Sequence, residues 1–267
     1  MSSNPQPQTI DGRRPFLNSP APTSPAPTSP VPTGAPPLII ADRLVKSYGP
    51  THALVGVSLT IAAGSSVAIM GPSGSGKTTL LHCLSGILPV TSGAIGLQLP
   101  SGQIRLETLD AAGRARLRRE HLGFVFQQGM LVPELTAVEN VALPLMLNGV
   151  PRAAAERQAE EWLVALGLPG LGERRIGQLS GGQAQRVAIA RAQAIDPALV
   201  FADEPTGALD SATSVDVMTA LLHSVTGRGR TLVVVTHDIN VARCCSRILT
   251  LADGRIVSDQ QVTGGRR

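Results

Sequence analysis

The sequence has few cysteines and few aromatic residues. Its 267 residues include only three cysteines, Cys83, Cys244 and Cys245, too few and too unevenly spaced for a disulfide framework or a zinc site. We expect the adjacent pair to be small buried apolar residues on a helix, and this usage fits a reducing compartment. Aromatic residues make up 2% of the chain, so the core must consist mainly of Ala, Val, Leu and Ile side chains.

Long apolar runs are also missing. No stretch reaches the ~18–20 apolar residues that a membrane span needs, and the N-terminus lacks the apolar region of a signal peptide. We therefore expect a soluble protein that stays inside the cell. The formal net charge is +4, but the basic residues are scattered and are not interleaved with aromatic side chains that could stack on bases. We expect no nucleic-acid partner.

The first 37 residues differ in composition from the rest. They hold eleven of the 21 prolines, and the segment APTSP of residues 21–25 is repeated at 26–30. Such sequence cannot bury enough apolar surface to offset the entropy lost on ordering. We expect a disordered tail over residues 1–37, a folded domain over residues 38–260 and a C-terminal tail over residues 261–267.

Short apolar runs predict a parallel sheet. Almost continuously apolar runs suit strands that helices cover on both faces, and less uniform runs predict two further strands. The helical pattern of Arg152–Leu166 places Ala155, Ala159, Trp162, Leu163 and Leu166 on one face, and Gly167 ends it. The order of strands and helices indicates an α/β fold. The four apolar runs are 67–70, 122–126, 198–202 and 231–235, and the two further strands are 38–41 and 57–61.

Each of the four apolar runs is followed by a polar or glycine-rich group. In open α/β sheets, ligands bind outside the carboxyl ends of the strands. We therefore expect four groups that are distant in sequence to converge on one edge of the sheet. The groups are Gly71–Thr79, Gln127 with Gln128, Asp203 with Glu204, and Thr236 with His237 and Asp238.

The first group fits the P-loop pattern completely, between a predicted strand and a helical stretch at 79–84. Backbone N–H groups of such a loop point inward, and the helix N-terminus adds partial positive charge, so the loop binds phosphate. Lys77 supplies a mobile charge for the β- and γ-phosphates, and the Thr78 hydroxyl can ligate Mg²⁺. The candidate nucleotide-binding residues here are Gly71, Pro72, Ser73, Gly74, Ser75, Gly76, Lys77, Thr78 and Thr79.

The other three groups supply a metal ligand, a candidate base and two hydrogen-bonding side chains. Asp203 can hold Mg²⁺, which leaves Glu204 to orient or deprotonate an attacking water. His237 can hydrogen-bond the γ-phosphate and that water, and the Gln127 amide can contact metal and water. We expect Glu204, His237, Gln127 and Lys77 to be catalytic, and Thr78, Gln127 and Asp203 to hold the metal.

A second motif, LSGGQ at residues 179–183, provides another hydroxyl and N–H cradle before the helical run 185–194. Its binding residues are Ser180, Gly181, Gly182 and Gln183. One nucleotide does not need two such cradles from one chain. Two chains arranged head to tail would let each cradle close over the γ-phosphate bound by the other chain.

Taken together, these motifs resemble ABC-transporter ATP-binding domains. LSGGQ, the P-loop, FADE at 201–204, ALD at 208–210 and His237 occur in the order of that family, and the resemblance covers about residues 38–260. It implies a P-loop NTPase core with a mostly parallel sheet, an antiparallel β subdomain, and an inserted α-helical subdomain at about 127–180. It also implies that the groove of the helical subdomain receives a coupling helix of the membrane partner.

The resemblance also implies individual roles. Tyr48, the only tyrosine, would stack on adenine, and Gln127 would link catalysis to the membrane partner. Ser180 and Gly182 would act on the nucleotide of the other chain, and Asp210 would cross the dimer interface. The cofactors implied are ATP and Mg²⁺.

Within the family, three segments are most similar to the lipoprotein-releasing and macrolide-export group: FVFQQ at 124–128, PELT at 133–136 and DEPTGALD at 203–210. The implied partners are a second copy of the chain and transmembrane permease subunits. The implied location is cytoplasmic, peripheral on the inner face of the cell membrane. The implied activity is ATP hydrolysis that energises export or extraction of a substrate.

Two alternatives stay open from the sequence. One is a soluble ABC ATPase that acts on ribosomes or DNA; such members usually carry tandem domains or a long coiled coil, and neither pattern occurs in this sequence. The other is an ATPase that signals or transmits force through a membrane partner without transport. Co-purification with a permease favours transport or signalling, whereas co-sedimentation with ribosomes or DNA favours the first alternative.

Overall fold

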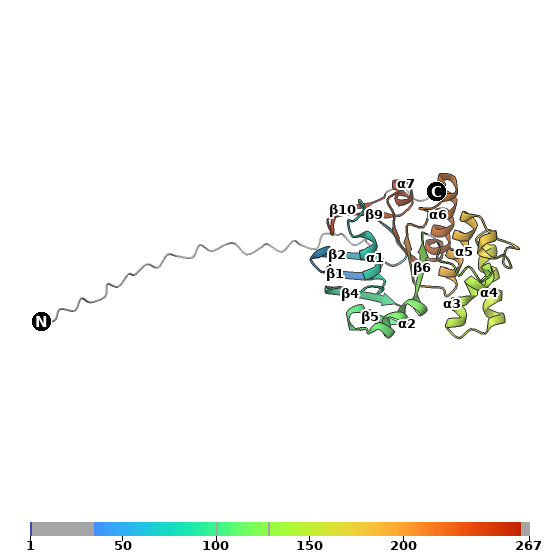
Figure 1. Ribbon diagram of the computed structural model, residues 1–267, viewed down its shortest axis with the longest axis horizontal. Coiled ribbons are helices and arrows are strands. Elements are labelled where there is room, and N and C mark those ends of the chain that lie inside the picture. The colour runs from blue at the N-terminus through green and yellow to red at the C-terminus, as the bar shows by residue number, and fades with distance from the viewer. Residues whose placement is uncertain (2–34, 100, 128, 263–267) are drawn as a thin grey trace.

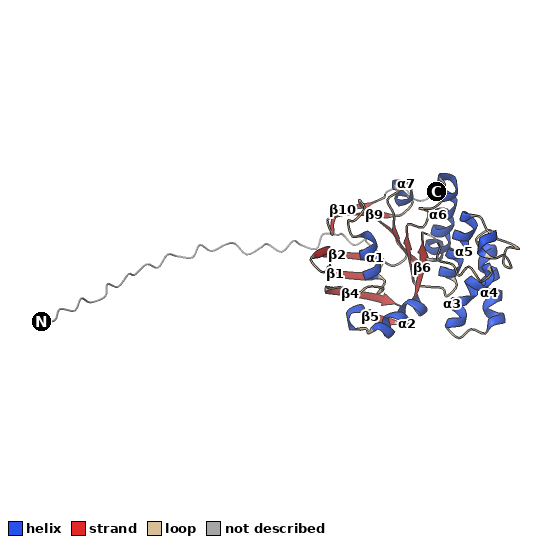
Figure 2. Cartoon of the chain, in the orientation of Figure 1, coloured by secondary structure: helices blue, strands red, loops and turns tan. Residues whose placement is uncertain are grey.

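The computed structural model describes residues 1, 35–99, 101–127 and 129–262. Most of the expected N-terminal tail, Gln128 and residues 263–267 therefore lie outside the described residues. The described part forms two sheets, with helices packed around them (Figures 1 and 2). None of its helices is long and apolar enough to cross a membrane.

The smaller sheet is antiparallel, with the strand order β2-β1-β4-β5. Strands β1 and β2 form a long hairpin whose backbone pairing continues from Pro37↔Ala62 to Tyr48↔Thr51, so both strands are longer than their apolar runs predict. Strand β4 buries every second side chain, at Ile95, Leu97 and Leu99. Continuous apolar runs predict neither β4, whose buried residues alternate with others, nor β5, which is short and mostly exposed. The bounds are β1 Pro37–Tyr48, β2 Thr51–Ala62, β4 Ser92–Leu99 and β5 Gly102–Arg105.

The larger sheet has the strand order β10-β9-β3-β8-β7-β6. Five of its strands are parallel, and β10 pairs antiparallel with β9. The four predicted apolar runs are its strands β3, β6, β7 and β8, within one residue at each end. Strands β9 and β10 were not predicted because β9 alternates buried with partly exposed residues and β10 has no buried residue. The bounds are β3 Ser66–Met70, β6 Leu122–Phe126, β7 Leu199–Asp203, β8 Thr231–Val235, β9 Arg247–Ala252 and β10 Arg255–Gln261.

The helices begin close to the functional motifs. Helices α1 and α5 start earlier than the predicted 79–84 and 185–194, at Lys77 and Gly181, because the ends of both glycine-rich loops are themselves helical. The helical pattern of Arg152–Leu166 is confirmed by α4. The bounds are α1 Lys77–Leu84, α2 Ala111–His121, α3 Ala137–Leu147, α4 Arg152–Ala165, α5 Gly181–Gln193, α6 Ser211–Val225 and α7 Ile239–Arg243, with short 3₁₀ turns at Leu106–Thr108, Ile176–Gln178 and Thr226–Arg228.

The prediction that the adjacent cysteines are buried residues on a helix was wrong except for the burial of Cys245. Cys245 is buried, but Cys244 is exposed and lies just after α7. Helix α7 ends at Arg243, so neither cysteine lies within it, and of the two only Cys245 belongs to the core.

Side chains on the larger sheet alternate between its two faces, and each face has its own core. Val67 and Ile69 of β3 pack with α1 and the antiparallel sheet, whereas Ala68 between them packs in the core formed by α3–α6. Strand β8 alternates in the same way, with Val233 on the first face and Val234 on the second. Helices α1 and α5 therefore lie on opposite faces of the larger sheet, as their separation in Figure 1 also shows. This architecture confirms the predicted α/β fold with a mostly parallel sheet.

Candidate nucleotide-binding site

The four predicted groups follow β3, β6, β7 and β8, which are neighbouring or nearly neighbouring parallel strands. Because parallel strands end at the same edge of a sheet, the P-loop, Gln127, Asp203 with Glu204, and His237 lie along one edge. Direct contacts link several of them, as described below.

The P-loop backbone requires glycine at two positions. Gly71 has φ +145°, and a Cβ there would lie 2.1 Å from the carbonyl oxygen of Leu251 in β9. Gly76 has φ +100°, and a Cβ there would lie 2.4 Å from the carbonyl oxygen of Ala53 in β2. Both values are far below van der Waals contact, so only glycine lets the loop pack against both sheets.

Polar groups inside the loop are arranged to meet an anion. The Lys77 ammonium donates to the carbonyl oxygens of Gly71 and Pro72, both at 2.9 Å, which holds its charge within the loop. The Ser75 hydroxyl is buried and has no hydrogen-bond partner among the described residues. Since buried hydroxyls are normally paired, this group fits a ligand oxygen. The loop therefore suits a phosphate chain.

Thr78 and Asp203 form an oxygen pair suited to Mg²⁺. The Thr78 hydroxyl donates to the Asp203 carboxylate at 3.3 Å. Burial raises the pKa of Asp203 above its usual range, partly opposed by His82, Thr78 and Lys77. Mg²⁺ prefers oxygen ligands and typically takes one or two from protein, with phosphate and water completing its shell. The pair fits that pattern.

No sequence motif includes His82, yet it lies beside Asp203. Its pKa is lowered by burial, and the charge of Asp203 opposes that shift. Its spacing in the sequence could have indicated this position, because a residue four positions after Thr78 lies on the same helix face as Thr78.

Glu204 and His237 form the second contact across the edge. The His237 Nδ1 and a Glu204 carboxylate oxygen are 2.9 Å apart. Glu204 has φ +47°, a conformation that non-glycine residues rarely adopt, and its N–H donates to the Val235 carbonyl at 2.9 Å. This backbone bond to β8 fixes Glu204 in a strained turn. The His237 side chain is 71% exposed against 20% for Glu204, so the histidine faces outward and the carboxylate inward.

Gln127 lies on the same edge beside the loop after Glu204. A Cβ at Gly207 would lie 2.9 Å from the Gln127 side-chain nitrogen, so the amide packs directly over that glycine. No hydrogen bond within the described residues joins Gln127 to Thr78 or Asp203. The structure thus places Gln127 near the predicted metal ligands without a direct link.

The LSGGQ motif forms the start of α5. The Ser180 hydroxyl accepts from the Gln183 N–H, and the Gln183 side chain accepts from the Ser180 N–H, which makes a capping box. A Cβ at Gly182 would lie 2.5 Å from the Thr213 side chain of α6, and one at Gly181 would lie 3.2 Å from that of Leu209. The glycines therefore let this helix end pack closely against the start of α6.

Asp210 lies beside that contact. It caps α6 by accepting from the Thr213 N–H at 3.0 Å and from the Thr213 hydroxyl at 2.6 Å. The hydrogen bond from Thr213 lowers the pKa of Asp210. Thr213 thus connects Asp210 to Gly182, a contact that the sequence did not indicate because the two motifs are about thirty residues apart.

Tyr48 ends β1, and the residue as a whole is 48% exposed. The Lys46 ammonium lies over the ring, 5.2 Å from its centroid. The ring is therefore held from one side and retains open area for stacking.

The two cradles of the chain are separate. The P-loop continues into α1 on one face of the larger sheet, and the LSGGQ motif continues into α5 on the other. Among the described residues, no hydrogen bond or ion pair joins Ser180–Gln183 to Gly71–Thr79. In this chain the structure therefore brings together the P-loop, Asp203, Glu204 and His237, and leaves the LSGGQ motif apart from them.

Comparisons with known proteins show the family of the chain. The model of the ABC transporter family matches residues 54–207. An ABC transporter ATP-binding protein of Methanocaldococcus jannaschii is 44% identical, over 80% of this chain and 91% of its own length. The macrolide export ATP-binding/permease protein MacB of Escherichia coli is 46% identical over 79% of this chain, and the chain spans about a third, 33%, of that relative.

A solved structure has the same fold. It is the dimeric ATP-binding cassette MJ0796 in a post-hydrolysis state bound to ADP and Pi, with 41% identity and a TM-score of 0.75, over 85% of this chain and 99% of that one. The predicted similarity to the macrolide-export group is confirmed by the MacB relatives. On its motifs, its fold and these relatives, the chain belongs to the ABC transporter family, as an ATP-binding cassette.

Proposed function

We propose that this chain binds ATP with Mg²⁺ and hydrolyses it as a head-to-tail dimer, which energises export or extraction of a substrate through separate transmembrane permease subunits. The cassette relative solved as a dimer with ADP and Pi supports both the dimer and the hydrolysis. The observation that carries the proposal is the placement of α1 and α5 on opposite faces of the larger sheet.

That placement makes one copy incomplete. A phosphate chain held at the N-terminus of α1 lies on the other side of the sheet from the Ser180 hydroxyl and the N–H groups of Gly181 and Gly182. A second copy related by a two-fold axis can present its LSGGQ motif to this P-loop while its own P-loop receives the motif of the first. Asp210, which adjoins Gly182 through Thr213, would then lie at the same interface.

Different residues of the chain carry out different parts of ATP binding and hydrolysis. Lys77 and the loop N–H groups bind the phosphates, and Tyr48 stacks on the adenine. Thr78, Asp203 and Gln127 would hold Mg²⁺, which when bound neutralises charge that develops on the phosphates. Glu204 accepts the proton of the attacking water, and His237, 2.9 Å from Glu204, orients that carboxylate and the γ-phosphate.

The permease partner is supported by the lengths of the relatives. The archaeal relative, named an ATP-binding protein, is covered over 91% of its length, whereas MacB, named an ATP-binding/permease protein, is covered over 33%. The match to a third of an ATP-binding/permease protein supports a permease as the partner of this cassette. In this proposal the cassette sits on the inner face of the cell membrane.

Replacing Glu204 by Gln tests the catalytic assignment. Loss of a positioned base should lower the rate of ATP hydrolysis by about 10²- to 10⁴-fold, while ATP binding persists and ATP-loaded dimers accumulate on gel filtration. Glu161→Gln, at an exposed position on α4, is the matched control and should hydrolyse ATP normally. Near-normal turnover by Glu204→Gln would refute the role of Glu204.

Affinity purification from membranes tests the partner. A tagged chain should retain an integral membrane protein in detergent, and its ATPase rate should change when that protein is present. Retention of ribosomes or DNA in place of a membrane protein would contradict the proposal.

A further inference from the structure

Lys46 makes two contacts that no role described so far explains. Its ammonium lies over the Tyr48 ring, 5.2 Å from the centroid, and donates to the carbonyl oxygen of Pro89 at 2.8 Å. Residues two apart on a strand point to the same side, so β1 presents both side chains together. A cation over an aromatic face is attracted by the electron density of the ring.

The Pro89 carbonyl belongs to the loop between α1 and β4, and this loop is fixed at both ends. The Leu88 N–H donates to the His82 carbonyl of α1 at 3.0 Å. The Thr91 N–H donates to the Val45 carbonyl of β1 at 2.8 Å, and the Thr91 hydroxyl accepts from the Ser47 N–H at 3.0 Å. The loop therefore ties the end of β1 to the end of α1.

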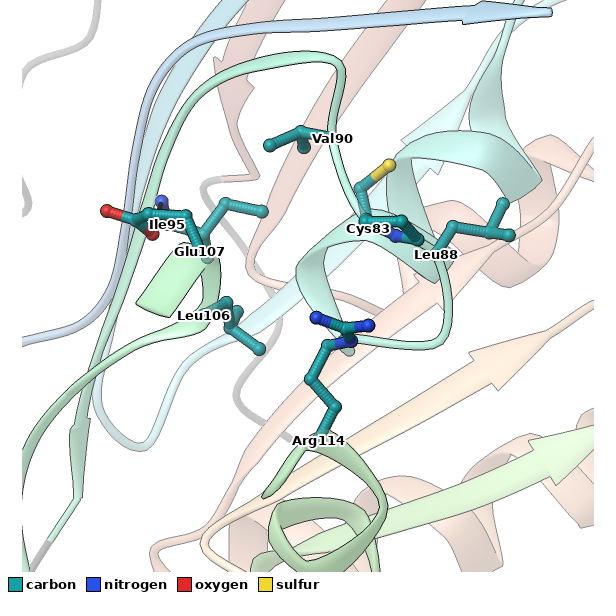
Figure 3. A pocket seen from close by; sticks show the side chains of 9 residues that line it. Cys83, Leu88, Val90, Ile95, Leu106, Glu107 and Arg114 are labelled. Carbon is teal, nitrogen blue, oxygen red and sulfur yellow. Dashed lines mark hydrogen bonds between the residues drawn. The ribbon is translucent and has the colours of Figure 1, made fainter. Parts of the chain in front are cut away.

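Side chains pack beneath the same loop. Leu88 and Val90 line a small pocket together with Cys83 of α1, as Figure 3 shows. Burial raises the pKa of the Cys83 thiol to about 11, and the nearby charge of Lys46 opposes that shift. Lys46 thus lies between the Tyr48 ring and the C-terminal end of the helix that begins at Lys77.

From these contacts we infer that Lys46 is a positioning residue for recognition of the nucleotide base. It covers one face of the Tyr48 ring and links the ring through Pro89 to α1, so the other face is presented to the base at a fixed distance from the phosphate-binding end of α1. The inference rests on the proposed function, because it takes Tyr48 as the stacking residue. In addition to that function, Lys46 sets the distance between the subsite for the base and the subsite for the phosphates.

A comparison of the affinities for ATP and for inorganic tripolyphosphate, which has no base, distinguishes this role from a general structural one. Calorimetry with Mg²⁺ in the Glu204→Gln background avoids hydrolysis. Lys46→Met keeps a linear side chain and removes the charge. It should weaken ATP binding about two- to fivefold, the value of an exposed cation–π contact, and leave tripolyphosphate binding unchanged. Lys46→Arg should bind ATP like the parent.

A double-mutant cycle completes the test. If Lys46 acts through the ring, Lys46→Met should have no further effect on ATP binding once Tyr48 is replaced by Leu. Equal weakening of tripolyphosphate, an unchanged ATP affinity in Lys46→Met, or additive losses in the double variant would each overturn the inference. If Tyr48→Leu leaves the ATP affinity unchanged, Tyr48 does not stack on the base and the inference is wrong. If the parent protein does not bind ATP at all, the proposed function itself is wrong.

Discussion

At the scale of single residues, the site depends on backbone conformations that few residue types allow. Gly71 and Gly76 have positive φ and face carbonyl oxygens of β9 and β2. Glu204 adopts φ +47° without being glycine, and its N–H bond to Val235 holds it there. Strain of this kind persists where surrounding structure fixes it. The backbone thereby holds the Glu204 carboxylate beside His237 at the edge of the larger sheet.

The buried thiols predict a loss of stability at alkaline pH. Burial raises the pKa of Cys83 from 9.0 to about 11 and that of Cys245 to about 12. The unfolded chain releases these protons first, so native stability is full below pH 9.0 and falls as the pH rises from 9.0 toward 11. Urea unfolding across this range measures the fall. The Cys83→Ala, Cys245→Ala double variant should show a shallower decline, and an equal decline would contradict the assignment.

At the scale of elements, the loop between Gln127 and α3 depends on one buried amide. The Asn140 side chain accepts from the Val132 N–H at 2.8 Å and donates to the carbonyl oxygens of Val132, Leu135 and Thr136. Asn140 is fully buried. It therefore shapes the segment that connects the larger sheet to the helices α3 and α4.

Replacing Asn140 by Ala should destabilise the fold by about 1–3 kcal/mol, because the buried N–H and carbonyl groups of the loop lose their partner. Denaturant unfolding measures the change. Gln158→Ala, at an exposed position on α4, should change the free energy of unfolding by less than about 0.5 kcal/mol. Equal effects of the two substitutions would show that the amide does not organise the loop.

The sequence predicted those elements whose pattern is uniform. Continuous apolar runs predicted β3, β6, β7 and β8 almost to the residue, and one-face periodicity predicted α4. Strands β4 and β9 were not predicted because buried residues alternate in them with partly exposed ones, which leaves no continuous apolar run. The starts of α1 and α5 were placed too late because glycine usually disfavours helix interiors, whereas here capping and phosphate-loop geometry place it in or next to the first turn.

The sequence predicted which residues belong to the candidate site better than it predicted the contacts between them. The P-loop, Asp203, Glu204 and His237 follow parallel strands, so the order of strand and motif sufficed to place them on one edge. The contact of Asp210 with Thr213 and that of Thr213 with Gly182 arise from the packing of α5 on α6, which no local pattern encodes. The placement of α1 and α5 on opposite faces likewise became clear only from the structure, in which side chains along each strand alternate between two cores.

At the scale of the whole molecule, the folded part is fixed at its start by Pro36 and Pro37. The Pro36 carbonyl accepts from the Ala63 N–H at 2.9 Å, and Pro37 pairs with Ala62. Residues before this point hold the repeated APTSP segment. We propose that they form a tail outside the ATP-binding domain.

Deleting residues 2–34 should leave the free energy of unfolding and the ATPase rate unchanged, since the contacts of Pro36 and Pro37 are kept. Thermal unfolding and a phosphate-release assay measure both quantities. Extending the deletion through residue 40 removes the first pairs of β1 with β2 and should lower the melting temperature. A collapse in soluble yield on deleting only 2–34 would show that the tail is structural.

The most direct test of the account mixes two inactive variants. Lys77→Met disables the P-loop, and Ser180→Asp keeps a good helix cap but places a negative charge where the partner's γ-phosphate would lie. In a head-to-tail dimer the mixture contains heterodimers with one intact composite site, so hydrolysis should return to about a quarter of the wild-type rate. If heterodimers form and the mixture is no more active than the separate variants, each copy does not complete the other, and the account is wrong.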